Sequence, residues 1–396
     1  MSERSEDIVN DGYLLLKSIA DMELDYIEKN GHAHPGCNGP YKNKDTAIRN
    51  SGHFLIIYSY LYEKTQNNRY LTAVKSLSDF LMREDNYGKS GSIEHRTDNR
   101  FDHTNGLIGQ AWTIEALVEA YKLTKLGYTY EKAKQLFLNQ RFNYDTKMWI
   151  VVDCDGTLSL DLTFNHQLWF AAAGAMLLDI EYDSKIDEEI KLFLEEASNK
   201  FFQVRENGRI VHVMNYSPSE HEKERQREII KQYKRRTLLK EPLSVIKKKF
   251  KDKLSKNSFT EGIEEGYHLF DLYGFALLYN RYSKLSIYSS EKFSKALDYM
   301  KNSDNILGLS KNCGGYPYNK FAYAYNSPAF EYPFVANTFL CFNDSVEKKL
   351  IESQCSLLFD ASKGTFKSCD DPYTLNARTY ELVRYFRQLD NKDCSI

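Results

Sequence analysis

The stretch MWIVVDCDGTLSLDLTFNHQLWFAAAGAML, residues 148–177, decides the fold, because its two halves point to different architectures. Its first half is an apolar, strand-like run that ends at an Asp-Cys-Asp-Gly turn. Its second half is apolar on every side of a helix, and such a helix must be surrounded by protein. The rest of the chain has to decide between a parallel sheet and an assembly of helices.

Two kinds of helical segment alternate along the sequence. Five segments are apolar nearly all round, and we expect them inside: 53–62, 106–121, 166–178, 268–279 and 329–342. Five others have one charged face, which belongs at the surface: 70–83, 130–142, 186–202, 290–302 and 345–359. Helices near 6–29 and 379–389 complete six inner and six outer helices. This pattern predicts an all-α (α/α)6 toroid, a ring of six helical hairpins, as a single domain over residues 1–396.

Short β-hairpins are expected before several inner helices. In the opening stretch, MWIVV and TLSLDL flank an Asp-Gly turn, which strongly favours a hairpin. Similar hairpins are predicted at 90–95, 206–213 and 364–368.

The alternative for this stretch is a phosphatase. Asp153-Cys154-Asp155-Gly156-Thr157-Leu158 resembles the nucleophile motif of haloacid-dehalogenase-type phosphatases. That resemblance implies that Asp153 attacks phosphorus and that Asp155 acts as acid and base. It also requires a parallel sheet, and the chain has too few Val- and Ile-rich strands for one. We therefore favour the hairpin.

Polar, aromatic-rich segments lead into the six inner helices, at 45–53, 101–106, 161–166, 264–268, 325–331 and 375–381. In a ring, the six helix starts lie on one side, so their side chains should converge on one cleft, with the positive ends of the helix dipoles. Simple helix caps would explain the Asp, Asn and Ser residues. Caps explain the histidines less well: His53, His103, His166 and His268.

Two of these helix starts resemble known families. Asn105-Gly106 is similar to the Asn-Gly that begins an inner helix in six-hairpin glycosidases, such as unsaturated glucuronyl and rhamnogalacturonyl hydrolases. Asn165-His166-x-x-Trp169 resembles the Asn-His-x-x-Trp motif of alginate-lyase-like toroids. The second resemblance implies that Asn165 and His166 act at a substrate carboxylate.

Two chemistries follow for an acidic glycan or oligosaccharide. In the favoured one, glycosidase-like hydrolysis, two carboxylates flank the scissile bond; the candidates are Asp102, Asp161, Glu265 and Glu331. In the alternative, a lyase or uronate or sugar epimerase, Asn165 and Arg378 hold a carboxylate, His166 removes a proton and Tyr332 returns one. A glycan-binding toroid without chemistry is a third possibility.

The remaining candidates are expected to contact substrate: His53, His103, Asn105, Trp169 and His268. No cofactor motif is present, and no metal site is predicted. The net charge of −2 argues against a nucleic-acid partner. Seven unpaired-looking cysteines and the absence of a signal-like or membrane-length apolar run predict a cytoplasmic protein.

A basic helical insertion is predicted at 218–260. Between residues 221 and 256 it carries fourteen Lys or Arg against five Asp or Glu. Such a segment could contact an anionic glycan or a membrane surface, or could simply be a solvated helix pair broken at Pro242.

Overall fold

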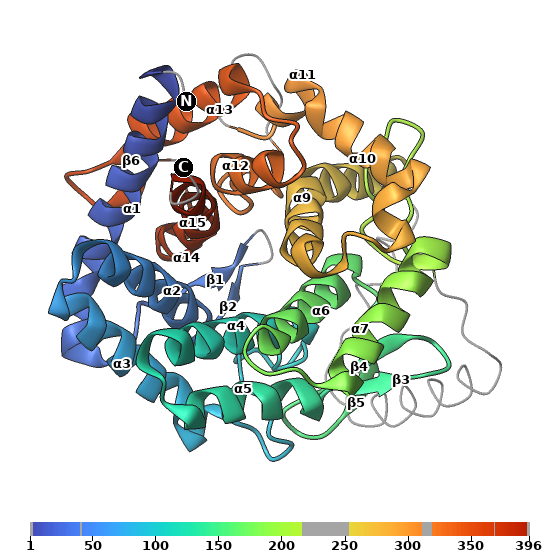
Figure 1. Cartoon of the computed structure of the whole chain (residues 1–396), viewed down its shortest axis with the longest axis horizontal. Helices are drawn as coiled ribbons and strands as arrows, with labels where there is room; N and C mark the ends of the chain where they lie inside the picture. Colours follow the sequence, from blue (N-terminus) through green and yellow to red (C-terminus); the bar gives the residue numbers. More distant parts are fainter. Residues whose placement is uncertain (1–2, 40–41, 216–252, 311–318, 368, 394–396) are drawn as a thin grey trace, which may run out of the picture.

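The computed structural model describes residues 3–39, 42–215, 253–310, 319–367 and 369–393. Within these residues the chain forms two concentric rings of helices (Figure 1). Most of the predicted basic insertion, residues 218–252, lies outside the described residues, and with it most of the segment 221–256 that was considered for contact with an anionic glycan or membrane surface.

Six helical segments form the inner ring. They are α2 (Ile48–Thr65), α4 (Gly106–Thr124), α6 (Phe164–Leu178), α9 (Lys253–Tyr282), α12 (Pro328–Thr338) and the pair α14 (Pro372–Ala377) and α15 (Glu381–Asp393), joined by the turn Arg378–Tyr380. Each packs against the next, and the last pair packs against α2, which closes the ring. The predicted (α/α)6 toroid is confirmed.

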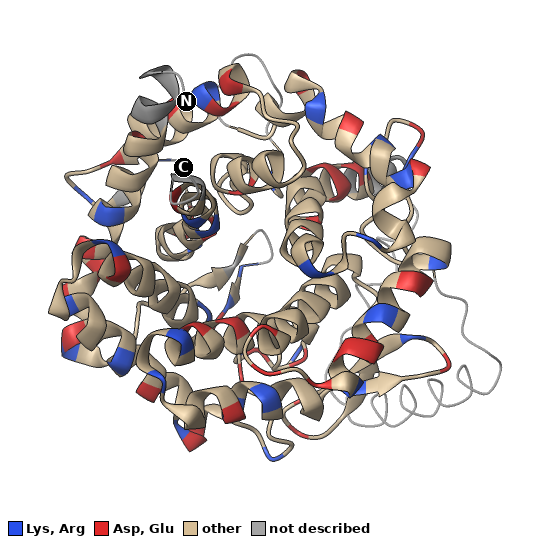
Figure 2. Cartoon of the chain, in the orientation of Figure 1, with Lys and Arg blue, Asp and Glu red and all other residues tan. Residues whose placement is uncertain are grey.

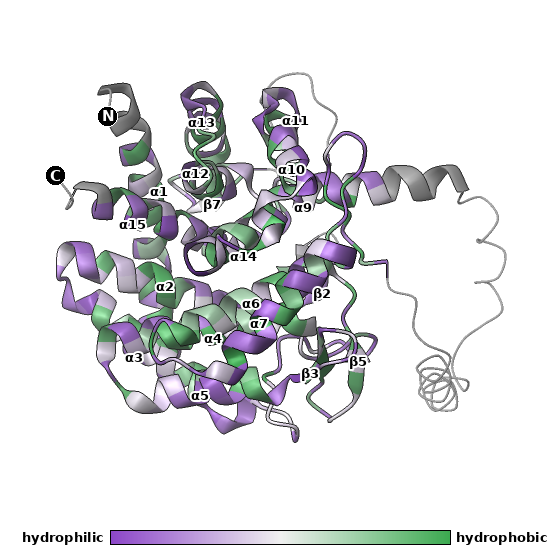
Figure 3. Cartoon of the chain, turned by 45° about the vertical axis from the view of Figure 1, so that its right-hand side comes forward, coloured by the Kyte–Doolittle hydropathy of each residue, from purple (hydrophilic) through white to green (hydrophobic). Residues whose placement is uncertain are grey.

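The outer ring is amphipathic, as the sequence predicts. It consists of α1 (Glu3–Asn30), α3 (Asn68–Met82), α5 (Gly127–Asn139), α7 (Ser184–Glu196), α10 (Glu291–Lys301) with α11 (Ser303–Leu307), and α13 (Asp344–Ile351). Charged residues lie mainly on these helices (Figure 2), whereas α4 and α6 are predominantly hydrophobic (Figure 3). The core lies between the rings: Phe137 of α5 stacks on Phe170 of α6, with ring centroids 4.6 Å apart.

Side-chain caps are more common on the outer helices than on the inner ones, although inner α14 is capped by Asp371 and outer α5 has no side-chain cap. Outer helices α3, α7, α10 and α13 each have an Asn, Asp or Ser N-cap whose side chain accepts a backbone N–H. Inner helices α2, α4, α6 and α12 have no side-chain cap bond. The first N–H groups of α4 are instead accepted by the side chains of Asp102 and Asp161, which lie outside the N-cap position.

The strands are short and antiparallel. β3 (Arg141–Asn143), β4 (Met148–Val152) and β5 (Leu158–Leu160) form one sheet, which confirms the predicted hairpin. β1 (Cys37–Asn38) pairs with β2 (Asn43–Lys44), and β6 (Phe359–Asp360) with β7 (Thr365–Phe366). Single bridges, Tyr87 to Ile93 and Val204 to Ile210, form at two other predicted hairpins.

The phosphatase alternative is wrong. Asp153 lies in the β4–β5 turn, where its Oδ1 accepts the backbone N–H groups of His103 and Thr104 at 2.9 and 3.1 Å. No sheet within the described ranges is parallel. Asp153 therefore anchors the loop before α4 and does not stand at the carboxyl edge of a parallel sheet.

Some predicted boundaries are also wrong. Residues 264–268 were expected to precede an inner helix, but they lie within α9, which begins at Lys253. The expected helix 345–359 ends as an α-helix at Ile351 and continues as the π-turn Glu352–Leu358. α2 begins at Ile48, five residues before the expected start.

Candidate active site

A cavity of about 190 Å³ lies where the starts of the inner helices α4 and α6 meet the loops that lead into their neighbours. It is smaller than the roughly 300–1,000 Å³ typical of sites for drug-sized ligands, so it suits a small ligand. Fourteen residues line it: Asn43, Arg96, Phe101, Asn105, Ile108, Trp112, Thr163, His166, His212, Tyr267, Phe270, Tyr325, Asn326 and Arg378.

The lining combines flat apolar rings with hydrogen-bonding groups. Five of the fourteen residues are aromatic, three are asparagines, two are arginines and two are histidines. None of these described residues is an Asp or a Glu. Aromatic walls with a few convergent polar groups are typical of small-molecule sites.

The start of α4 is shaped by two residues in the left-handed conformation. Asn105 and Gly106 have φ angles of 58° and 62°, a region that suits Asn and Gly. The N–H of Gly106 donates to Oδ1 of Asp102 at 2.5 Å. This turn aims the Asn105 side chain at Arg96, whose Nη2 donates to Oδ1 of Asn105.

At the start of α6, Asp161 holds the ring of His166. Its Oδ2 lies 2.7 Å from Nδ1 of His166, and it also accepts the N–H groups of Leu107 and Thr163, each at 3.1 Å. Burial favours the protonated acid, but His166 and these two N–H groups more than offset it, so the pKa of Asp161 is lowered. An ionised carboxylate only accepts, so Nδ1 carries a proton, and in the neutral tautomer of the ring Nε2 is the atom with the lone pair.

Arg96 brings a cation to the same cavity. Its Nη1 lies 3.3 Å from Oδ2 of Asp102, whose side chain is about one-third exposed, 34%. Phe101, 40% exposed, lies beneath the guanidinium at 5.8 Å. The pairing with Asp102 is long for a charge-assisted bond, so Arg96 retains donor capacity toward a ligand.

His212 reaches the cavity from the segment before the insertion. Its carbonyl accepts the N–H of Phe164 at 2.9 Å, and the N–H of Met214 donates to the carbonyl of Leu162 at 2.9 Å. These bonds lay the segment beside the start of α6. The His212 ring contacts Tyr267 of α9, with centroids 4.6 Å apart.

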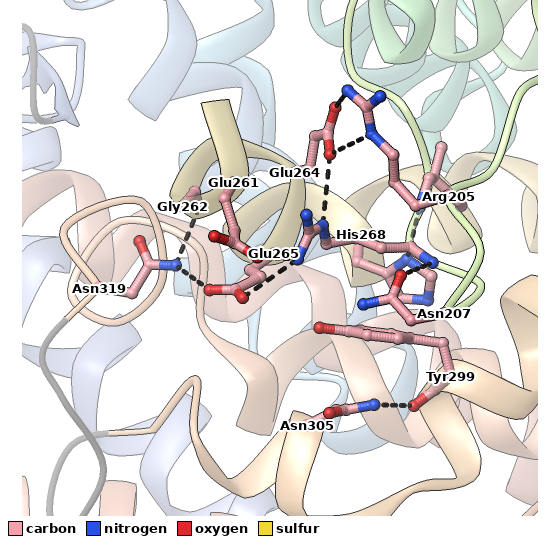
Figure 4. Close-up of polar contacts among 12 residues, drawn as sticks. Arg205, Asn207, Glu261, Gly262, Glu264, Glu265, His268, Tyr299, Asn305 and Asn319 are labelled. Carbon is pink, nitrogen blue, oxygen red and sulfur yellow. Dashed lines mark hydrogen bonds and ion pairs between the residues drawn. The ribbon is translucent and has the colours of Figure 1, made fainter. Parts of the chain in front are cut away.

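A cluster of ion pairs anchors the same segment to α9 (Figure 4). Glu264 is 1% exposed; Arg205 bonds both of its oxygens, at 2.5 and 3.0 Å, and Arg209 Nε lies 3.3 Å from Oε2. Arg209 also reaches Glu261 at 2.9 Å and Glu265 at 3.3 Å. We call Arg205, Arg209, Glu261, Glu264 and Glu265 the hairpin clamp, because it fixes the turn that precedes His212.

Arg378 forms part of the cavity wall, but its donors are already engaged by neighbouring side chains. It donates to Glu331 at 2.8 Å, to Glu381 at 2.5 Å and to Asn326 at 2.6 Å. Burial, followed by mutual repulsion, raises the pKa of Glu331 well above its usual value. Burial likewise raises the pKa of Glu381 to about 7. Arg378 was expected to hold a substrate carboxylate, yet its donors are already engaged by two buried acids.

Of the predicted site residues, Asn105, His166 and Arg378 line the cavity, while Asp102, Asp161 and Asn165 each bond a lining residue. Asn165 does not face the cavity: it is fully buried behind His212, with Nδ2 3.4 Å from Nδ1 of that ring.

Three predicted residues pack in the core instead. His53 lies in the second turn of α2, stacked on Tyr380 at 4.0 Å. Trp169 donates from Nε1 to the carbonyl of Phe270 at 3.1 Å and stacks on that ring. The Tyr332 hydroxyl lies near the start of α13, at the backbone of Asn343, and burial raises its pKa. The Tyr332 hydroxyl therefore points away from the cavity and is not placed to return a proton there.

Four others have structural partners outside the cavity. His103 Nδ1 lies 2.8 Å from Oε1 of Glu94. His268 accepts the N–H of Ile210 and bonds the carbonyl of Ala296 at 3.0 Å. Glu265 belongs to the hairpin clamp, and Glu331 is 1% exposed beside Arg378. Their positions make Glu265 and Glu331 poor candidates for carboxylates that flank a glycosidic bond.

The sequence interpretation missed several lining residues, above all Arg96, Trp112, His212 and Tyr267. Arg96 and His212 come from hairpin-like segments and not from helix starts. The run RIVHVMNYS, with one histidine between alternating apolar residues, was the available signal for His212.

Within the described parts of the chain, no group of three or more His, Cys, Asp or Glu side chains is arranged to hold a metal ion. None of the described helices is both long enough and apolar enough to cross a membrane.

Comparisons with known proteins first define the fold class. The chain resembles cellobiose 2-epimerase from Bacillus thermoamylovorans, with 13% identity, a TM-score of 0.60, and 96% of this chain and 99% of that chain covered. It also resembles a D-mannose isomerase, with 13% identity and a TM-score of 0.59, over 96% of this chain and 99% of that chain. The similarity to an unsaturated glucuronyl hydrolase specific for heparin has 12% identity and a TM-score of 0.55, over 96% of this chain and 98% of that chain. The protein is an (α/α)6 toroid.

The family follows from a relative in sequence. No family model matches the chain. Archaeal glycosylation protein Q of Haloferax volcanii is 30% identical over 372 residues, which cover 93% of this chain and 96% of that protein. The chain therefore belongs to the family of Archaeal glycosylation protein Q.

Proposed function

We propose that the protein modifies a sugar by removing and returning a proton on carbon, in the manner of an epimerase or isomerase, with His166 as the base. The observation that carries this proposal is the His166–Asp161 pair. With Nδ1 on Asp161, Nε2 is the ring nitrogen left for a cavity whose described lining contains no carboxylate, and in the neutral ring it can accept a proton.

Two-carboxylate hydrolysis is the second candidate. It needs an acid and a base or nucleophile on either side of the glycosidic oxygen. Among the predicted carboxylates, Asp102 is the best placed, since it is partly exposed beside Arg96. Asp161 is committed to His166 and two backbone N–H groups, which leaves it little freedom to move a proton. Proton transfer by His166 accounts for the geometry better.

The substrate class rests on three features. The aromatic lining and the small volume suit one sugar ring. The name of the relative links its family to glycosylation. Arg96, only loosely paired with Asp102, favours a sugar that carries an acidic group, either free or within an oligosaccharide.

The test is deuterium uptake from D2O, followed by NMR, over a panel of reducing aldoses, free uronic acids and unsaturated uronide disaccharides. We expect deuterium at the carbon next to a carbonyl or carboxylate, without new reducing ends. His166→Asn should abolish the uptake. His32→Asn is the control, because His32 hydrogen-bonds the Ala33 carbonyl and is not among the residues that line the cavity.

Three outcomes would overturn the proposal. New reducing ends without deuterium uptake would show hydrolysis. Absorbance of an unsaturated uronate would show elimination. Sugar binding without either change would indicate a glycan-binding toroid.

A further inference from the structure

We propose that His212 is a second catalytic residue, a neutral imidazole whose Nε2–H hydrogen-bonds the substrate oxygen that gains negative charge. This inference rests on the proposed function, and it assigns to His212 a role opposite to that of His166. The inference depends on the positions of the two histidines in the cavity, on the hydrogen-bonding partner of each ring, and on the burial of His212.

The first step is position. His212 and His166 both line the cavity, and the two backbone bonds between residues 162–164 and 212–214 hold their segments side by side. A substrate in the cavity therefore meets both rings. The His212 ring also packs against Tyr267, with centroids 4.6 Å apart.

The second step is the tautomer of His212. The amide nitrogen of Asn165 lies 3.4 Å from Nδ1 of His212. An amide nitrogen only donates, so Nδ1 must accept, and the single proton of a neutral ring then resides on Nε2. Burial raises the pKa of the neighbouring Asp271 well above its usual value, and the Asn165 amide offsets part of that rise.

The third step is the charge of the ring. Burial lowers the pKa of His212 to about 3, and the nearby Asp161 carboxylate offsets only a small part of that shift. At neutral pH the ring is therefore uncharged. A neutral imidazole is a poor source of a full proton, because losing one would create an imidazolate. It is a good fixed donor of one hydrogen bond.

Together the two histidines present opposite atoms to the substrate. His166 Nδ1 is bound to the Asp161 carboxylate, so a lone pair is presented. His212 Nδ1 is bound to the Asn165 amide, so an N–H is presented. The aspartate and the asparagine behind the rings set this polarity, and both are positioning residues.

Proton transfer begins at the carbon next to the substrate carbonyl or carboxylate. The C–H bond next to the substrate carbonyl or carboxylate breaks, and its proton passes to Nε2 of His166. The electron pair forms a carbon–carbon double bond, and the negative charge moves to the oxygen. His212 stabilises that oxygen through its N–H without losing the proton. The planar intermediate turns over, and the imidazolium of His166, paired with Asp161, returns the proton to the opposite face of the same carbon. The charge on the oxygen then flows back to restore the carbonyl or carboxylate, which yields the epimer.

The experiment reads tautomers directly. Two-bond 15N–1H correlation spectra of the full-length protein with 15N-labelled histidine distinguish protonated from unprotonated ring nitrogens. We expect His166 to carry its proton on Nδ1 and His212 on Nε2, with His166→Asn and His212→Gln spectra assigning the signals. Asn165→Asp should move the His212 proton to Nδ1 or charge the ring, because a carboxylate accepts.

Activity adds a second readout, with the panel sugar that exchanges deuterium as probe. His212→Gln keeps an N–H near the position of Nε2 and should retain exchange within about tenfold. His212→Leu and Asn165→Asp should lower kcat about 10²–10³-fold, the usual effect of losing one oxyanion donor. KM should change little. Equal thermal unfolding midpoints for the Gln and Leu variants would exclude a merely structural effect.

The outcomes separate the two ideas. A His212 ring with its proton on Nδ1, or an unchanged kcat in His212→Leu, overturns this inference but leaves His166 as the base. Absence of exchange with every panel sugar overturns the proposed function. The spectra then still test, independently of activity, whether His212 carries its proton on Nε2.

Discussion

The missing side chain of Gly106 leaves the space that the Asp161 carboxylate occupies. A Cβ on Gly106 would lie 2.3 Å from Oδ2 of Asp161 and 2.8 Å from Nδ1 of His166. Gly106 also has a φ of 62°, where a Cβ is strained. Gly106 is therefore needed for two reasons. The turn requires a positive φ angle, and the Asp161–His166 pair occupies the space that a Cβ would fill.

We predict that Gly106→Ala weakens both stability and catalysis. The left-handed backbone alone should cost about 1–2 kcal/mol. Displacement of Asp161 should turn His166 and reduce proton exchange roughly 10²-fold, since a shift of about 1 Å can have that effect. Urea unfolding and the deuterium assay measure the two losses.

Gly156→Ala is the matched control. Gly156 has a φ of 89° in the β4–β5 turn, and a Cβ there would meet no atom within 4 Å. This variant should lose only the backbone contribution and keep full activity. If the two variants behaved alike, the proposed steric role of Gly106 would be refuted.

Replacement of Asp161 by Asn should destabilise the protein most at neutral pH. The folded-state pKa of Asp161 is lowered, so its ionised form stabilises the fold above the unfolded value of 3.8, and that contribution disappears as the pH falls through the acid range below about 4. We expect a loss of about 1–3 kcal/mol at pH 7, as for other buried hydrogen-bonded groups.

The comparison is made by urea titration of both proteins from pH 7 to pH 3. The difference in unfolding free energy should shrink at the acid end. A difference that stays constant, or grows, below pH 4 would contradict the role of the ionised carboxylate.

The ring architecture could be predicted because each inner helix needs protein on every side. The segment 166–178 has no face that tolerates water, and in the structure α6 contacts α4, α5, α7 and α9. Alternation with amphipathic segments then fixes the direction of the inner helices. For that reason Asn105, His166 and Arg378, all near inner-helix starts or the joint of the last pair, meet at one cavity.

The site was less predictable where one turn of helix changes the environment. His53 was expected at a helix start, but α2 begins at Ile48, and the five extra residues bury the ring in the core. Arg96 and His212 depend on contacts that are distant in sequence, such as the bond from Phe164 to the His212 carbonyl. Hydrophobic periodicity contains no information about such contacts.

The hairpin clamp offers a test of how His212 is held. Glu264→Gln leaves Arg205 and Arg209 beside a neutral amide in a buried place, and we expect a loss of about 3 kcal/mol, the lower end for a broken buried ion pair. The N–H groups of Ile210 and Met214 should exchange faster with D2O, because the segment loses its anchor.

Glu261→Gln is the control for the clamp, since Glu261 contacts the same Arg209 at 2.9 Å but has a 55% exposed side chain. Its loss should stay below about 1 kcal/mol. Equal losses in the two variants, or unchanged hydrogen exchange in Glu264→Gln, would mean that the clamp does not hold the segment.

Buried neutral histidines should make the fold sensitive to mild acid. Burial lowers the pKa of His95, His212 and His268 to about 3 each. The unfolded chain has values near 6.5, so it binds more protons than the folded protein between pH 6.5 and 3. Stability must therefore fall as the pH drops through that window, by about 1.4 kcal/mol per pH unit for each fully neutral ring.

His268→Gln removes one such ring from contact with Ile210 and Ala296. The variant should be less stable at pH 7, yet its stability should fall less steeply, by about one proton, between pH 6 and pH 4. Urea unfolding at half-unit pH intervals gives the slope, and a slope equal to that of the unmodified protein would show that His268 is protonated in the fold.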